Sequence, residues 1–546
     1  MPFVKWKFNR MLAVATVVMA VNYVVMLSGS VIVGNLVGAD GLAGVNTCTP
    51  VFGVASFLAS LLSVGSGLVF SRAMGAFDVQ RAEGIFSQSM FLSACLGAAI
   101  YAAMQFGETA FLDLTGVTGD VRQQAEHYWR GQAVAMALLP SVLTLEALVY
   151  ADGDGPVALL AGVLHVAGSI GLATFFTWRS GDAGGASLGA ALTMTAVLAA
   201  CSLHFLRANG HLRFRRFLSA AALRETLAAS LADSTIYLCW GILVFIVNKF
   251  AVTRYGQDAL PLVALAASVV EFSIVFDGVG EALIPLGGMY DAEGNRPALR
   301  ELANWSATVA VLEGVVCGTL FFALAPQVAQ CYGDFGVSAG RYADAARVVR
   351  ILAPAMPFMA LLMMMNTHFL VVRHLPFAVS VTVMKDLVCP TLGVLTLGWL
   401  GESGIWAGFA AGYAVAAAYP FAFVLARHGR SRFPWLIARD DGRSTDFTVM
   451  LTNRAPSCVR ARADAFLNRL SISWAGEILT AVDADLRATA AANRRPVRVE
   501  CYVSAEEPDT VRMIVRDNGK TLASAGGKYL NTLGCNRTEY LLRKAD

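Results

Sequence analysis

The apolar stretch 259–286 contains three acidic residues, Glu271, Asp277 and Glu281. Carboxylates are costly inside a membrane and normally face a cavity or one another. In a uniform helix Asp277 and Glu281 share one face, and Glu271 lies about 80° from Glu281. The spacing predicts one broad acidic face that binds a cation or a proton. The alternative is that Glu281 lies at the membrane interface and Glu271 pairs with a base.

Three other ionisable residues in apolar stretches are candidates of the same kind. Glu146 and Asp233 each lie within a predicted helix, where each could also sit at an interface or cap a helix end. Lys385 precedes Asp386, and the two are predicted to form a self-neutralising pair. The seven histidines form no helical pair beside an acid, and the ten cysteines form no close pair, so no metal site is predicted.

The composition indicates which elements hold these residues. Of the 546 residues, 56% are hydrophobic and 15% are charged, whereas soluble domains carry about 25% charged residues. The charges are uneven, because residues 427–546 contain 34 of the 81 charged side chains. The first part is therefore predicted to lie in a membrane and the second to be a small soluble domain. The formal net charge of +3 gives no reason to expect nucleic-acid binding.

Twelve segments are long and apolar enough to span a membrane, which takes about 20 residues. They are 11–33, 47–70, 85–105, 128–150, 157–178, 186–206, 226–249, 259–286, 302–325, 346–371, 376–399 and 403–426. Sixteen lysines and arginines lie near one set of helix ends and seven near the other. Since positive residues favour the cytoplasmic side, both termini are predicted to be cytoplasmic.

Two short motifs recur in the same order in the two halves of the membrane part. They are Gly38-Ala-Asp40-Gly-Leu42 with Gly256-Gln-Asp258-Ala-Leu260, and Gly75-Ala-Phe77-Asp78 with Gly288-Met-Tyr290-Asp291. With six helices per half, the halves share one orientation, as in transporters built from parallel repeats. The predicted domains are a six-helix lobe at 1–220, a second six-helix lobe at 221–430 and a cytoplasmic domain at 431–546.

Over about residues 10–426 the order of these motifs resembles the multidrug and toxic compound extrusion (MATE) family. The resemblance rests on Ile32-Val-Gly34-Asn35, Val64-Gly65-Ser-Gly67, Ser71-Arg72-Ala-Met-Gly75 and Leu283-Ile-Pro285-Leu-Gly287. It implies an all-α membrane fold, with two lobes around a central cavity that opens alternately to each side. It also implies a multi-pass protein of the bacterial cytoplasmic membrane that exports organic cations or other amphiphiles in exchange for H⁺ or Na⁺.

The sequence departs from this family at two positions. Many bacterial members carry an aspartate in the first helix where this chain has Gly29, and another family pattern places a glutamate in the seventh helix, where Cys239 and Gly241 flank Trp240. The family's coupling residues therefore cannot be carried over. The acids described above and Lys385 are the candidates for ion or substrate binding, and no cofactor beyond the coupling ion is expected.

Residues 440–546 are predicted to form an α/β domain. Two helices, at about 458–470 and 474–492, precede two alternating strands at 497–503 and 511–515. The Asp517-Asn-Gly519 turn that follows resembles the adenine-binding element of anti-sigma-factor and histidine kinases, in which the aspartate bonds to the adenine amino group.

The rest of the nucleotide site is reduced. The helix that should supply a Mg²⁺-binding asparagine contains Asp483 and Asp485 but no asparagine before Asn493, and the glycine-rich lid is reduced to Gly526-Gly527. Without its metal ligand such a helix positions ATP·Mg²⁺ poorly. The domain is predicted to be a degenerate regulatory module that does not act as an enzyme.

Two function classes follow from these features. The first is a secondary active exporter with a regulatory tail, and the second is a membrane sensor that uses a transporter fold and signals through the tail. The missing coupling residues favour the sensor, whereas the repeat and the acidic stretch favour the exporter. The expected partners are a small-molecule substrate, the lipid bilayer and a regulatory protein at the tail.

Overall fold

The fold is described from a computed structural model of the chain. It describes all residues except 116, 208–209, 257–258, 332–341, 439–441, 452–454, 494–495, 506–508, 521–526 and 545–546. Helices make up the chain as far as Arg432, and a mixed helix and strand domain, which we call the tail, follows from Ser444.

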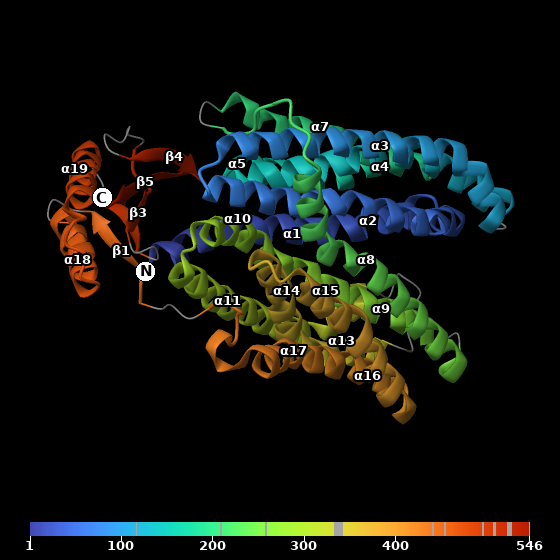
Figure 1. Cartoon of the computed structure of the whole chain (residues 1–546). Helices are drawn as coiled ribbons and strands as arrows, with labels where there is room; N and C mark the ends of the chain where they lie inside the picture. The colour runs from blue at the N-terminus through green and yellow to red at the C-terminus, as the bar shows by residue number, and fades with distance from the viewer. Residues whose placement is uncertain are drawn as a thin grey trace.

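Two groups of helices form the first part of the chain (Figure 1). The first bundle contains α1 (Phe3–Leu36), α2 (Ala39–Gly75), α3 (Val79–Thr115), α4 (Gly119–Ala151), α5 (Gly155–Ala167), α6 (Ala173–Ser180) and α7 (Gly184–Ser202). The second bundle contains α8 (Ala220–Tyr255), α9 (Leu260–Glu271), α10 (Asp277–Glu293), α11 (Arg296–Ala323), α12 (Ala325–Cys331), α13 (Tyr342–Leu352), α14 (Met356–Val371), α15 (Leu375–Val383), α16 (Cys389–Leu397) and α17 (Glu402–Arg432).

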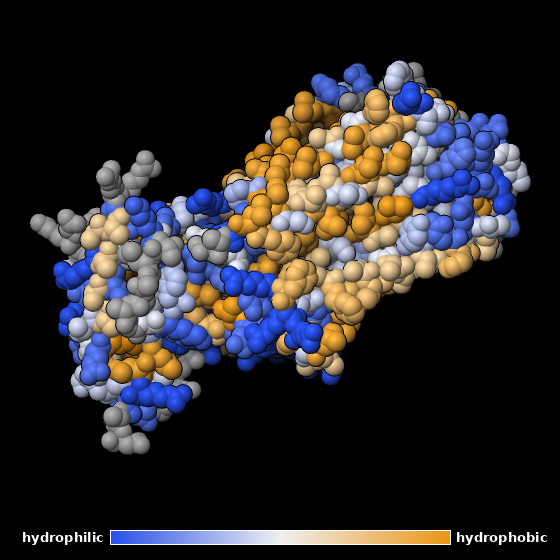
Figure 2. All heavy atoms as spheres, turned by 90° about the horizontal axis from the view of Figure 1, so that it is seen from above, coloured by the Kyte–Doolittle hydropathy of each residue, from blue (hydrophilic) through white to orange (hydrophobic). Residues whose placement is uncertain are grey.

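The helices have the length and composition of membrane spans. Ten helical segments within the described residues are apolar enough to cross a bilayer. The other two predicted spans, 11–33 and 259–286, fall in α1 and in α9–α10 and include side chains outside the described set, so the count of twelve stays a prediction. Figure 2 shows an apolar surface over the middle of the helical part, with polar surface at its end and on the tail. The protein is a multi-pass membrane protein.

Small residues allow these helices to pack closely. A side chain at Gly65 of α2 would lie 2.0 Å from the carbonyl oxygen of Thr226 in α8, and one at Gly408 of α17 would lie 2.4 Å from that of Gly393 in α16. In a membrane, helix association depends on such close van der Waals contact, because burial of apolar surface gives little driving force there. The glycines therefore fix contacts between the two bundles and within the second one.

The two bundles lie against each other beside the tail and spread apart toward the opposite end (Figure 1). At the tail side, α2 of the first bundle packs on α8 and α10 of the second. Arg72 of α2 lies 3.7 Å from Asp291 of α10 and donates to the carbonyl oxygen of Val371 at 2.9 Å. The described structure is thus closed at the tail side.

The predicted helix 259–286 is not one uniform helix. A 3₁₀ segment, Phe272–Phe276, separates α9 from α10. A 3₁₀ turn advances about 120° per residue rather than 100°, so the segment rotates α10 relative to α9. The three acids line two separate pockets rather than one site, and their positions are given below.

The tail is a five-stranded antiparallel sheet with strand order β1-β2-β3-β5-β4. The strands are β1 (Ser444–Leu451), β2 (Val497–Ser504), β3 (Thr510–Asp517), β4 (Lys528–Thr532) and β5 (Cys535–Arg543), and the helices are α18 (Ala455–Arg469) and α19 (Gly476–Ala492). The sequence predicted both helices and the two central strands but missed β1, β4 and β5. The helices pack on one face of the sheet through a core that includes Val499 and Leu479.

The other face of the sheet does not face solvent but lies against the ends of the helices. Tyr502 of β2 donates to the carbonyl oxygen of Gly294 at 3.1 Å, and the backbone amide of Phe3 donates to Thr448 of β1 at 2.9 Å. The N-terminus and the tail are consequently on the same side of the bundles (Figure 1).

This arrangement gives a topology prediction. We expect single cysteines at Ser180, the last residue of α6, and Gly401, which directly precedes α17, to react with an impermeant thiol reagent added outside the cell. A cysteine at Gln80, in the first turn of α3, should react only after permeabilisation. The reverse labelling pattern would place the tail outside the cell.

Candidate binding pockets

A pocket of about 200 Å³ lies within the second bundle. It is lined by side chains of α8, α9, the 3₁₀ segment, α10, α14, α17 and the π-helical turn Met384–Val388: Ile236, Tyr237, Trp240, Val270, Glu271, Ser273, Ile274, Asp277, Met363, Lys385, Asp386 and Tyr413. The pocket thus brings together three of the ionisable residues predicted from the sequence.

The 3₁₀ segment explains why two of these acids meet. A uniform helix would place Asp277 about 120° away from Glu271 around the axis, but five residues of 3₁₀ helix reduce this to about 20°. Both carboxylates therefore reach the same pocket. The indole nitrogen of Trp240 donates to Glu271 Oε1 at 3.1 Å and fixes that side chain.

Lys385 and Asp386 form the predicted ion pair. The Nζ atom of Lys385 lies 2.7 Å from Asp386 Oδ2, and both side chains are buried. Glu271, Asp277 and Asp386 carry three negative charges at the pocket against one positive charge from Lys385 when all are ionised. Aromatic walls beside a surplus of negative charge favour an organic cation, which an aromatic face attracts.

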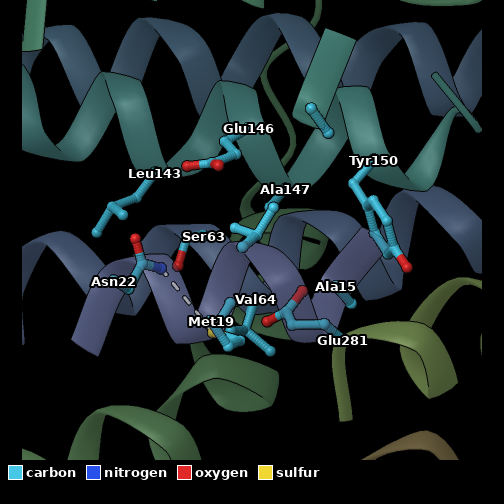
Figure 3. Close-up of a pocket in the computed structure, with 12 residues that line it drawn as sticks. Ala15, Met19, Asn22, Ser63, Val64, Leu143, Glu146, Ala147, Tyr150 and Glu281 are labelled. Atoms are coloured by element: carbon cyan, nitrogen blue, oxygen red, sulfur yellow. Dashed lines mark hydrogen bonds between the residues drawn. The ribbon is translucent and has the colours of Figure 1, made fainter. Parts of the chain in front are cut away.

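A second cavity of about 100 Å³ lies between the bundles and is lined by two of the other predicted acids (Figure 3). Glu146 of α4 and Glu281 of α10 approach it from opposite sides, with Asn22 of α1 and Ser63 of α2 between them. Both acids are half-buried. Glu281 is thus separated from Glu271 and Asp277, and its counterpart in the cavity is Glu146.

The remaining candidates have separate positions. Asp233 is in α8, but its side chain lies outside the described residues. Among the described residues, no three histidine, cysteine, aspartate or glutamate side chains are placed to hold a metal ion.

In the tail, the predicted adenine-binding carboxylate is already bonded within the chain. Asp517 Oδ1 accepts from the Gly519 amide at 2.8 Å and from Asn536 Nδ2 at 2.9 Å. Burial raises the pKa of Asp517, while these two hydrogen bonds oppose the rise. Gly526 of the predicted lid lies outside the described residues. Asn536 thus already donates to the Asp517 carboxylate oxygen, and an adenine amino group would have to compete with it.

We therefore expect the full-length protein to bind ATP weakly or not at all, with no dependence on Mg²⁺. Asn536→Ala would free Asp517 from one of its two donors, so any nucleotide binding should be stronger in that variant. Isothermal titration of detergent-solubilised protein with ATP, with and without Mg²⁺, measures this. Micromolar, Mg²⁺-dependent binding by the unchanged protein would contradict the prediction.

An ionic cluster between the tail and the helix ends was not predicted from the sequence. Arg516 of β3 pairs with Glu500 of β2 and with Glu293 at the end of α10, and Arg537 of β5 lies 2.6 Å from Glu293. All four side chains are buried. The signal available in the sequence was the pairing of acids and arginines on strands that otherwise alternate with apolar residues.

One carboxyl group at this contact should make docking of the tail sensitive to pH. Burial raises the pKa of Asp446 to about 7, the amide of Asn295 opposes the rise, and the charge of Glu301 adds to it. Burial raises the pKa of Glu500 as well, and the charge of Asp446 adds to that rise. The pKa of Asp446 is therefore higher in the folded protein than in the unfolded chain. Its protonated form stabilises the docked tail fully below about pH 4, and this stabilisation is lost progressively as the pH rises through 7.

We expect Asp446→Asn to leave the melting temperature unchanged at about pH 4, to raise it at pH 5.5 and to raise it further at pH 8.5, since the amide needs no ionisation. Asn295 can still donate to the amide oxygen, as it does to Asp446 at 3.3 Å. The measurement is thermal unfolding of both proteins across this pH range. Equal melting temperatures at pH 8.5 would show that Asp446 is not the group that titrates.

Sequence comparisons point to one family of membrane proteins. Residues 15–173 match the MatE family. The multidrug export protein MepA of Staphylococcus haemolyticus strain JCSC1435 is 21% identical over 306 residues, which are 55% of this chain and 67% of that protein. MepA of Staphylococcus aureus strain bovine RF122 / ET3-1 is 21% identical over 260 residues, or 46% and 57% of the two chains. The chain thus aligns with 57% to 67% of the length of these two relatives.

Solved structures resemble the helical part over a greater length. A crystal structure of MATE in complex with MaL6 has a TM-score of 0.73 and 23% sequence identity, covering 78% of this chain and 96% of that chain. An outward-facing conformation of a multidrug resistance MATE family transporter gives the same values. The protein is therefore a multi-pass membrane protein that has the fold of the MATE transporters and matches the MatE family in its first bundle.

Proposed function

We propose that the protein is a secondary active efflux transporter that exchanges organic cations for H⁺ or Na⁺. The observation that carries the proposal is the pocket in the second bundle, in which three acids and one lysine line an apolar space with Trp240 and Tyr413. Its surplus of negative charge suits a cation, and its aromatic walls suit an organic one. The MATE fold and the similarity to multidrug export proteins support transport rather than catalysis.

The cavity between the bundles supports a role in coupling. Glu146 and Glu281 line it from the two bundles, so movement of one bundle would change the distance between the carboxylates. Two carboxylates that are brought close together hold a proton more readily than either one alone. In this proposal the pair takes up the coupling ion when the bundles approach and releases it when they separate.

Transport by purified protein in proteoliposomes tests the proposal. With ethidium as the organic-cation probe, we expect accumulation when either a proton or a sodium gradient is imposed, but not without a gradient. Imposing each gradient alone identifies the coupling ion. The absence of gradient-dependent ethidium movement, with protein shown to be folded and inserted, would contradict the proposal.

A sensor is the second candidate, and the docked tail is the observation that favours it. Because the tail contacts both bundles, a ligand that moves the bundles would also move the tail. A sensor should bind ethidium and change hydrogen exchange in the tail without gradient-driven transport. The same proteoliposomes therefore distinguish the two functions.

A further inference from the structure

We propose that the tail is a clamp that holds the two bundles together at one end, with the hairpin β4–β5 as the plug between them. The clamp would restrain an alternating-access cycle, because the bundles could separate at the tail side only after the hairpin withdraws. The proposal concerns conformation and does not depend on which compound is transported.

Arg537 of β5 contacts both bundles directly. Its guanidinium donates to the carbonyl oxygens of Met74 and Gly75, at 2.7 and 2.6 Å, and so caps the C-terminus of α2. The carbonyls at a helix C-terminus lack partners within the helix and carry partial negative charge. The same guanidinium lies 2.6 Å from the carboxylate of Glu293, the last residue of α10. One fully buried side chain therefore joins the end of a helix from each bundle.

The repeated sequence motifs take part in this contact. Phe77, which follows α2, lies under Arg537, with 3.6 Å from the guanidinium carbon to the ring centre. Tyr290, at the equivalent position of the second motif, lies under Arg516 at 4.8 Å. A cation over an aromatic face is stabilised further when both are desolvated. Each bundle thus offers the tail one aromatic ring from the same motif, and each ring holds one arginine.

The tip of the β4–β5 hairpin fills the space between the bundles. Leu533 is buried in a cluster that includes Phe8 of α1 and Met289 of α10, whereas Leu530 is buried with residues of the first bundle such as Phe70. The space around the tip leaves only about 10 Å³ unoccupied.

Two further backbone contacts hold this tip. The Lys7 ammonium donates to the carbonyl oxygen of Leu533, and a side chain at Gly153, in the turn after α4, would collide with the Leu533 backbone at 2.4 Å. The tip of the hairpin is therefore closely packed against helices of both bundles.

Leu533 occupies a conformation that suits glycine better than leucine. Its φ is 51°, in the left-handed region that leucine rarely adopts, and the next residue, Gly534, has φ 66°. A two-residue hairpin turn of this kind normally uses asparagine or glycine at its first position. The buried contacts of the leucine side chain compensate for this strain. A leucine at this position is therefore explained by its contacts with the bundles and not by the needs of the turn.

The test measures the distance between the bundles at the tail side. Spin labels are attached to cysteines at Gln80, in the first bundle, and Arg427, near the end of α17. Cys95 and Cys458, the exposed thiols among the described residues, are replaced by serine. The distance distribution between the labels is measured by pulsed electron paramagnetic resonance in lipid nanodiscs, without substrate or gradient.

The variant Leu533→Gly removes the apolar tip and relieves the turn, so the tail should stay folded. We expect the otherwise intact protein to give one narrow distribution and Leu533→Gly to shift most of it to longer distances. Leu533→Met, which keeps a buried apolar side chain of similar volume, should behave like the intact protein.

If the tail of the Leu533→Gly variant does not fold, a second pair of variants still tests the proposal. Arg537→Gln removes the bridge to α2 and α10 and should also give the longer distances. Arg543→Gln, on the same strand but exposed, makes the same change of charge and should have no effect. Identical distributions for Leu533→Gly, Arg537→Gln and the unchanged protein would overturn the clamp, whatever the transport assays give.

Discussion

Replacing Asp277 with asparagine is expected to abolish gradient-driven ethidium transport while leaving the protein folded and inserted. The same result is expected for Glu271→Gln. Each change removes one negative charge from a pocket in which Lys385 already neutralises one carboxylate. Loss of one partner of a desolvated charge pair costs about 2 kcal/mol or more, which is roughly a 30-fold loss of affinity for a cationic ligand.

Equilibrium binding of ethidium to the detergent-solubilised variants separates loss of binding from loss of coupling. Asp120→Asn serves as the matched control, because this carboxylate is exposed at the start of α4, away from both pockets. The Glu271→Gln, Asp277→Asn double variant is the strictest case. Full transport by that variant would exclude the pocket in the second bundle as the cation site.

A large loss of stability is expected when Arg516 is replaced by methionine. Arg516 lies between Glu500 and Glu293, and its removal would leave both buried carboxylates without this partner. Breaking a buried ion pair from one side costs about 3–5 kcal/mol. For a unit of roughly 100 residues this lowers the melting temperature by about 15 °C.

Hydrogen exchange of the backbone amides of β2 and β3, followed as the temperature rises, measures the loss of stability in the tail itself. Arg487→Met, which breaks an ion pair on the exposed surface of α19, should change the melting temperature by less than about 5 °C, because exposed pairs contribute under about 1 kcal/mol. Replacing Arg516 together with Glu500 and Glu293 by apolar residues should recover part of the stability. An unchanged melting temperature for Arg516→Met would mean that the cluster does not hold the tail in place.

Most of the helical part could be predicted from sequence because its signal is local. Each spanning segment is a continuous apolar run, and hydropathy alone identifies it. Hydropathy does not give the angular position of an acid around the helix axis, because that position depends on the local winding of the helix. The five residues Phe272–Phe276 wind more tightly than an α-helix, and nothing in their composition distinguishes them from the apolar residues on either side. The sequence therefore predicted which acids lie in the membrane part but not that Glu271 and Asp277 meet in one pocket. Glu281 lies one helical turn beyond Asp277 in α10 and lines another cavity, which the packing of the bundles decides.

The tail was harder to predict because both faces of its sheet are covered. In β2, Val499 and Cys501 pack on the helices, while the polar face with Glu500 and Tyr502 is also buried. An alternating strand of this kind predicts one solvated face. The groups that cover the polar face, such as Glu293 and Tyr290, are about 200 residues earlier in the chain, so no local pattern could reveal the contact.

The short connection between α17 and β1 lowers the affinity that the hairpin needs in order to stay bound. Only eleven residues separate Arg432 from Ser444. A tether of this length keeps the tail near its docking surface at an effective concentration on the order of millimolar. A separate copy of the tail would have to be present at a similar concentration to compete. The contact therefore needs only a modest intrinsic affinity to keep the tail docked, and loss of a single contact would be enough to release it.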